Sequence, residues 1–128
     1  NFSKDSSHWW DENGPFKPLH RLNPVRLSYI KTQICTAFDR DVKSLKPFEG
    51  LSILDIGCGG GLVCEPLARL GASVCGADAD ANAIGVARAH AHDMDLNIDY
   101  KAEPVEKIAQ QFDVVLALEI IRIYKESR

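Results

Sequence analysis

The sequence lacks an apolar run that could cross a membrane. Its best apolar stretch, Val114 to Ile121, contains Glu119 and is far shorter than the roughly 18 residues that a spanning helix requires. The start, Asn1 to Asp5, is polar and does not have the character of a signal peptide. We therefore expect neither a membrane span nor a signal peptide in these 128 residues.

The sequence also lacks C-x-x-C pairs and an excess of positive charge. Its four cysteines stand at positions 35, 58, 64 and 75, so we expect small buried residues of a reducing compartment rather than a metal or disulfide set. The net charge of −3 argues against general nucleic-acid binding. This charge is uneven: residues 1–50 hold eight Lys/Arg against six Asp/Glu (+2), and residues 51–128 hold seven against twelve (−5).

A third absence is a glycine that a dinucleotide site would need. A G-x-G-x-x-G fingerprint counted from Gly57 and Gly59 requires glycine where Leu62 stands. The sequence instead reads Asp55-x-Gly57-x-Gly59-x-Gly61. Glycines at this density let a ligand approach the backbone closely, which predicts a nucleotide-like pocket without the dinucleotide template.

The glycine cluster lies between two predicted elements. A short apolar run from residue 51 leads into it and a segment compatible with a helix follows, so the pattern predicts a strand, a tight turn and a helix. Residues 73–78 read as a second strand that ends at Asp78, 21 residues past Gly57, where a ribose-binding carboxylate is expected. The alternative is that the glycines form only a tight connection and that Asp78 caps a helix.

The remaining pattern is that of an α/β domain. Pro24 suggests a helix start, with an apolar stripe through about Arg40. A helix is expected from Asp80 or Asn82 to about residue 92, strands over 97–101 and 112–119, and a short helix over 104–110. His90 and His92 do not share a helix face, so we expect them to be solvated rather than ligands.

Trp9 and Trp10 begin an aromatic segment rich in turn formers. Adjacent residues point to different faces of a regular element, so one tryptophan could cover a ligand or meet a partner. The alternative is an arm that packs on the domain.

Taken together, these residues resemble the ubiquinone-biosynthesis O-methyltransferases, a family of class I S-adenosylmethionine-dependent methyltransferases. The glycine motif is similar to that of the superfamily. The segment Trp9-Trp10-Asp11 with residues 16–26 (FKPLHRLNPVR) is similar to the family's own signature. The resemblance runs from about His8 to Glu119 and is strongest to the mitochondrial, plant-like branch.

The resemblance implies a Rossmann-like methyltransferase sheet, here only its N-terminal half with about four parallel strands and flanking helices. It divides the chain into an N-terminal arm and helix (1–45), a cofactor-binding half (46–119) and a divergent tail (120–128). It further implies methylation of a polyprenylated catechol (demethylubiquinol) with S-adenosylmethionine. The cofactor contacts it implies are Arg26, Gly57, Asp78 and Leu118.

The family's divalent cation, such as Mg²⁺, is expected on an E-x-x-E-H motif, which here reads Glu119-Ile120-Ile121-Arg122-Ile123. Only Glu119 matches as a metal ligand, and an arginine at the second acid would repel a cation. The sequence therefore predicts a truncated chain with impaired catalysis, and it identifies no catalytic residue. A sheet that ended at the fourth strand would expose an apolar edge.

The sequence is also compatible with two other functions. One is a non-catalytic cofactor-binding or interaction module, and a less favoured one is a nicotinamide-dependent oxidoreductase. By resemblance, the partners are a polyprenylated phenol, a membrane surface and a ubiquinone-synthesis complex, without nucleic acid. The location implied is the matrix side of the mitochondrial inner membrane, as a peripheral protein, or the cytoplasm if the chain is bacterial. Lys17, Arg21, Arg26 and Lys31 beside the tryptophans are the candidate membrane contacts.

Overall fold

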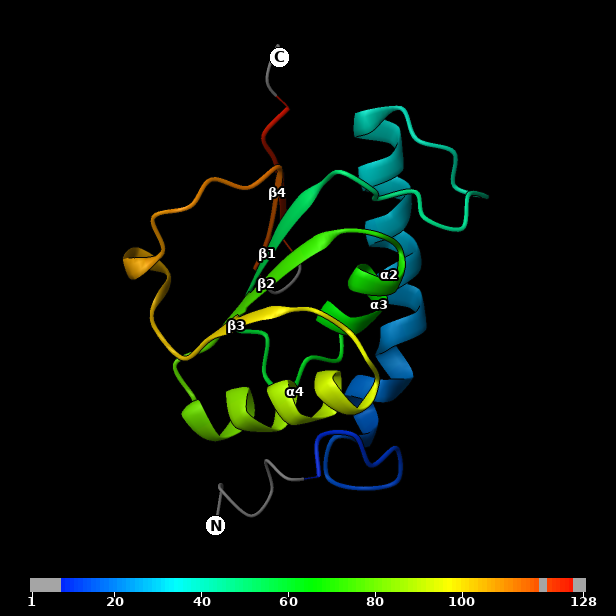
Figure 1. The fold of residues 1–128 in the computed structure, drawn as a ribbon. Helices are drawn as coiled ribbons and strands as arrows, with labels where there is room; N and C mark the ends of the chain where they lie inside the picture. Colours follow the sequence, from blue (N-terminus) through cyan, green and yellow to red (C-terminus); the bar gives the residue numbers. More distant parts are fainter. Residues whose placement is uncertain (1–7, 118–119, 126–128) are drawn as a thin grey trace.

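The computed structural model describes residues 8–117 and 120–125. One long helix precedes an alternation of strands and helices (Figure 1), and the last strand pairs antiparallel with the one before it. In chain order the elements are α2 (Lys17–Phe38), β1 (Ser52–Ile56), α3 (Cys64–Arg69), β2 (Ser73–Ala77), α4 (Ala81–Asp93), β3 (Asp99–Lys101), the 3₁₀ helix η1 (Val105–Lys107), β4 (Val114–Ala117) and β5 (Ile120–Ile123).

The strands form one sheet in the order β3-β2-β1-β4-β5. The first four are parallel, as the sequence predicts, and β1 lies between β2 and β4 with Leu54 opposite both Cys75 and Val115. Parallel neighbours require crossover connections, which α3 and α4 provide on the β1–β2 and β2–β3 sides. The carboxyl ends of β1, β2 and β4 therefore meet at one edge of the sheet.

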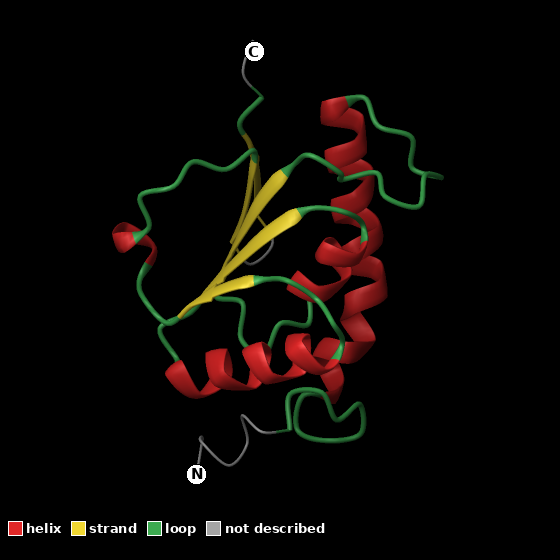
Figure 2. Cartoon of the chain, in the orientation of Figure 1, coloured by secondary structure: helices red, strands yellow, loops and turns green. Residues whose placement is uncertain are grey.

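The helices α2, α3 and α4 lie on one side of the sheet, and η1 lies on the other (Figure 2). The main core fills the helical side and includes side chains with no exposure at all, such as Ile34, Phe48, Ile53, Leu67 and Ile84. A smaller cluster on the other side centres on Leu54, Cys75 and Ala77. All four cysteines are free and buried, as the sequence predicts.

Helix α2 begins seven residues earlier than the predicted start at Pro24. Pro18 occupies the first turn, where the missing N–H costs nothing, and Pro24 lies inside the helix. Asn23 donates its side-chain amide to the Leu62 carbonyl at 2.8 Å and so ties this part of the helix to the glycine loop. Arg26 therefore lies in the body of α2 and not at the helix entrance, where the sequence predicts it.

Strand β5 is an element that the sequence reading does not predict. It pairs antiparallel with β4, with Val114 opposite Ile123 and Ala117 opposite Ile120. Ile121 and Ile123 pack on the main core, whereas Ile120 is 56% exposed on the other face. The side chains of β5 therefore alternate between the two faces of the sheet, and its pairing covers the edge of β4 that a four-stranded sheet would expose.

If β5 stabilises the sheet through its inward face, Ile123→Asp should lower the free energy of unfolding by roughly 1–3 kcal/mol, because it buries a carboxylate against the core. Ile120→Asp is the matched control on the exposed face of the same strand and should change it by less than about 0.5 kcal/mol. Urea unfolding measures both. Equal losses in the two variants would mean that β5 does not pack as described.

Candidate functional site

The glycine loop, residues 57–61, joins β1 to α3 at the carboxyl edge of the sheet. Gly57, Gly59 and Gly61 have φ angles of 75°, 55° and 92°, a region that side chains with a Cβ rarely adopt. The N–H groups of Gly57 and Cys58 both donate to the Ala77 carbonyl, at 2.7 and 3.1 Å. The loop is therefore fixed to the end of β2.

Close neighbours leave no room for side chains on most of this loop. A Cβ on Gly59 would lie 2.6 Å from Trp9 Cη2, and one on Gly60 would collide with the Trp9 indole. A Cβ on Gly61 would meet the Tyr100 hydroxyl. Gly57 differs, because no heavy atom would lie within 4 Å of its Cβ. Only Gly57 leaves open backbone for a ligand.

Asp78 lies immediately after β2 and beside the loop. Its Oδ2 accepts a hydrogen bond from the Gly59 N–H at 2.8 Å, and its Oδ1 accepts one from the Asp80 N–H at 2.9 Å. Asp80 in turn caps α4 by accepting from the N–H groups of Asn82 and Ala83. The helix-capping role is thus filled by Asp80, and two backbone bonds orient the half-buried Asp78 carboxylate.

A cavity of about 180 Å³ lies next to Gly57. Its polar and charged walls are Arg26 and Asn23 from α2 and Asp55 from β1, and Trp9 lines it from the N-terminal segment. The cavity therefore holds one cationic and one anionic side chain beside open backbone. Two of the four predicted cofactor contacts, Arg26 and Gly57, line it, and Asp78 lies outside it, beside the glycine loop.

Asp55 is a buried carboxylate in this cavity. Its pKa is raised to about 7, chiefly by burial and to a smaller extent by the neighbouring Asp78 carboxylate, and a hydrogen bond from the Cys64 thiol and the Arg26 guanidinium limit the rise. The Cys64 Sγ donates to Asp55 Oδ2 at 3.5 Å. A cationic ligand group in the cavity would favour the ionised carboxylate.

Residues 8–16 form an arm that packs on the domain. Trp9 stacks on Phe16, with ring centroids 3.9 Å apart, and lies against the glycine loop. Trp10 Nε1 donates to the Gly60 carbonyl at 2.9 Å. His20 Nε2 donates to the Trp9 carbonyl at 2.8 Å. Both tryptophans contact the domain, as expected of an arm that packs on it, and Trp9 also lines the cavity.

His90 is the residue that the sequence reading places wrongly. Its ring lies parallel to Trp10, with centroids 3.7 Å apart, and its Nδ1 donates to Glu65 Oε2 at 2.6 Å. Glu65 is fully buried and is also paired with Arg69 at 3.1 Å. His92 is exposed, as expected. No signal in the sequence indicates His90, because its partner lies 25 residues away.

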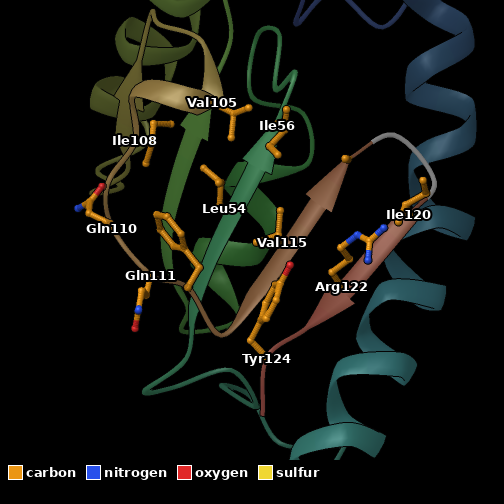
Figure 3. A pocket seen from close by; sticks show the side chains of 12 residues that line it. Leu54, Ile56, Val105, Ile108, Gln110, Gln111, Val115, Ile120, Arg122 and Tyr124 are labelled. Atoms are coloured by element: carbon orange, nitrogen blue, oxygen red, sulfur yellow. The ribbon is translucent and has the colours of Figure 1, made fainter. Parts of the chain in front are cut away.

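The metal motif predicted at residues 119–123 includes strand β5. Leu118 and Glu119 lie outside the described residues. Ile123 packs on the core, and Arg122 lies on the opposite face of the sheet, where it lines an apolar pocket of about 570 Å³ (Figure 3). Within residues 8–117 and 120–125 no group of three His, Cys, Asp or Glu could hold a metal ion.

Residues 53–127 match the family described as "Methyltransferase domain". Ubiquinone biosynthesis O-methyltransferases of Bartonella bacilliformis and Roseobacter denitrificans are 56% and 58% identical to this chain over 123 residues. Each alignment covers 94% of this chain and 50% of the relative. The resemblance found in the sequence is confirmed, and the chain spans about half the length of these curated relatives.

Solved structures show the same fold. Magnesium protoporphyrin IX methyltransferase from Synechocystis, with bound SAM, has a TM-score of 0.69 at 20% identity, covering 89% of this chain and 54% of that one. A Thermus thermophilus 16S rRNA methyltransferase, in complex with AdoMet and guanosine, has a TM-score of 0.53 at 25% identity, covering 56% and 20%. The predicted Rossmann-like methyltransferase sheet is thereby confirmed.

The contact between Trp9 and the loop can be tested with Gly60→Ala. The added methyl group would displace the indole, so we expect the free energy of unfolding to fall by roughly 1–3 kcal/mol and the tryptophan emission to shift to the red. Gly85→Ala is the matched control, because its Cβ meets nothing and lies in α4; it should stabilise by up to about 1 kcal/mol. An unchanged emission spectrum in Gly60→Ala would contradict the packing.

The burial of Asp55 predicts a pH dependence of stability. An acid whose pKa rises on folding, here from 3.8 to about 7, binds its proton more tightly in the folded state. The free energy of unfolding therefore falls as pH rises between these two values and levels off above them. Asp55→Asn should remove this loss. The difference in the free energy of unfolding between the variant and wild type should therefore shift in favour of the variant by on the order of 1–4 kcal/mol from pH 4 to pH 8. Urea unfolding at both pH values measures it, and an identical difference at both would contradict it.

Proposed function

The chain belongs to the methyltransferase domain family, and we propose that it binds S-adenosylmethionine as the cofactor half of a ubiquinone-biosynthesis O-methyltransferase. The observation that carries the proposal is the cavity in which Arg26 and Asp55 flank the open backbone of Gly57. The amino-acid end of the cofactor has one carboxylate and one ammonium group, and the cavity offers one partner of each opposite charge.

The residues present fit this cofactor. Arg26 would bind the carboxylate and Asp55 the ammonium group, and Gly57 would allow the ligand to approach the main chain. Asp78 would accept hydrogen bonds from the ribose hydroxyls, because its position after β2 and its two backbone bonds orient its carboxylate at the loop. The cavity of about 180 Å³ suits the amino-acid end, and the adenosine end would lie outside it, toward Asp78.

When bound, the cofactor supplies a methyl group on a sulfonium. The protein's own contribution is to hold the acceptor in line with that methyl group and to exclude water. The acceptor we propose, from the relatives, is the phenolic oxygen of a polyprenylated catechol. The described residues do not fit a divalent cation, because Arg122 faces the other side of the sheet and Ile123 packs on the core, so no step is assigned to a metal.

A second candidate function is that of a cofactor-binding module without catalysis. It is favoured by β5, which pairs with β4 at the position where the family's metal motif is expected. Transfer of a radiolabelled methyl group to a prenylated catechol separates the two functions. Product formation by the purified chain supports the enzyme, and cofactor binding without product supports the module.

Partners and location remain proposals from the resemblance. The described residues include no helix that is long and apolar enough to cross a membrane. Trp9 and Trp10, beside which the basic candidate membrane contacts lie in the sequence, stack on Phe16 and His90. The relatives named above are bacterial and give no support to the mitochondrial branch. We retain a prenylated phenol as the proposed partner.

Cofactor binding can be measured by titration calorimetry with S-adenosylmethionine. Asp78→Asn should weaken binding by about tenfold or more, because an amide replaces a charged acceptor of two hydroxyl hydrogen bonds. Asp93→Asn, an exposed acid at the end of α4, is the matched control and should bind as wild type. A folded wild-type chain that does not bind the cofactor, or that prefers a nicotinamide dinucleotide, would refute the proposed function.

A further inference from the structure

An apolar groove adjoins the cofactor cavity on the helical side of the sheet. It has a volume of about 400 Å³ and lies between α2 and the strands β4 and β5. Arg26, Ile30 and Leu116 line both the groove and the cavity. A molecule in the groove would therefore have one end next to the proposed cofactor site.

The groove continues outward along α2. Leu22, Val25 and Tyr29 line it at helical spacing and are 51%, 74% and 57% exposed. Val25 and Tyr29 also line a shallow outer depression on α2. The groove shares residues with the cavity at one end and with the depression at the other, so the three hollows follow one another as a path from Gly57 to the outer face of α2.

Charge is confined to the inner end of this path. Arg26 is the one charged residue that lines the groove within the described chain, and it lies at the junction with the cavity. The other groove residues are apolar or aromatic: Leu22, Val25, Tyr29, Ile30, Leu116 and Ile121. This order matches an elongated ligand with a polar or anionic head and a hydrocarbon tail.

We propose that the groove and the outer depression, together called the α2 groove, bind the hydrocarbon chain of a prenylated phenol. The ring lies at Arg26 and the chain extends along Leu22, Val25 and Tyr29. The inference rests on the proposed function, because it takes the molecule at the inner end to be the methyl acceptor. Exposed apolar side chains of this number are unusual on one helix face unless a ligand or partner covers them. The continuity with the cavity selects a ligand that reaches the cofactor.

The test is binding of a geranyl-substituted catechol and of unsubstituted catechol to the 128-residue chain, each in the presence of S-adenosylhomocysteine. Wild type should bind the geranyl compound at least about tenfold more tightly, because the chain buries apolar surface in the groove. Val25→Asp should abolish this preference. Val42→Asp is the matched control, since Val42 is also exposed, at 45%, but lies outside the groove.

Equal binding of the two catechols by wild type, or a preserved preference in Val25→Asp, would overturn the inference. Binding of S-adenosylhomocysteine is measured separately for wild type and every variant. If wild type does not bind it, the proposed function is refuted, and the groove is not. If Val25→Asp alone loses that affinity through misfolding, Tyr29→Ser at the other exposed groove position replaces it. A wild-type dimer that Val25→Asp dissociates, without any preference for the geranyl compound, would show that a second copy covers the groove and would also overturn it.

Discussion

A carboxylate removed from water has to be paired, and Glu65 imposes this requirement on the cofactor side of the protein. Its two oxygens bind Arg69 and His90, the His90 ring lies against Trp10, and Trp10 Nε1 donates to the Gly60 carbonyl. One buried charge in α3 thereby connects α4, the N-terminal arm and the glycine loop. Because Trp9 lines the cavity, the arm is part of the site rather than an appendage.

The two faces of the sheet differ in what they contribute. The helical face carries the main core, the cavity and the α2 groove, and all of these are built from residues of this chain. The other face carries η1 and the mainly apolar pocket of Figure 3, and Arg26, Gly57 and Asp78 are not among the described residues that line this pocket. In α/β folds with parallel sheets both faces are normally covered. Here the cavity and the α2 groove both lie on the helical face.

Local patterns predict the part of the site that is built locally. The strand, the glycines and Asp78 follow one another in the sequence, and their spacing alone indicates a nucleotide-like pocket. Contacts between distant segments escape such reasoning: His90 looks solvated because nothing near it shows that Glu65 is its partner. Pro18 and Pro24 both suit a first helical turn, so the prolines alone do not tell which of them begins the helix, and in the structure α2 runs from Lys17 through Pro24. Strand β5 is missed because the resemblance assigns those positions to a metal motif.

The contact between Trp9 and the glycine loop has an evolutionary corollary. The indole occupies the space that a Cβ at position 59 or 60 would need, so neither side can change alone without opening a gap or causing a clash. Among related chains we therefore expect positions 9, 59 and 60 to covary, with a small residue in the arm wherever a side chain enters the loop. Segments fifty positions apart would then be inherited as a single unit.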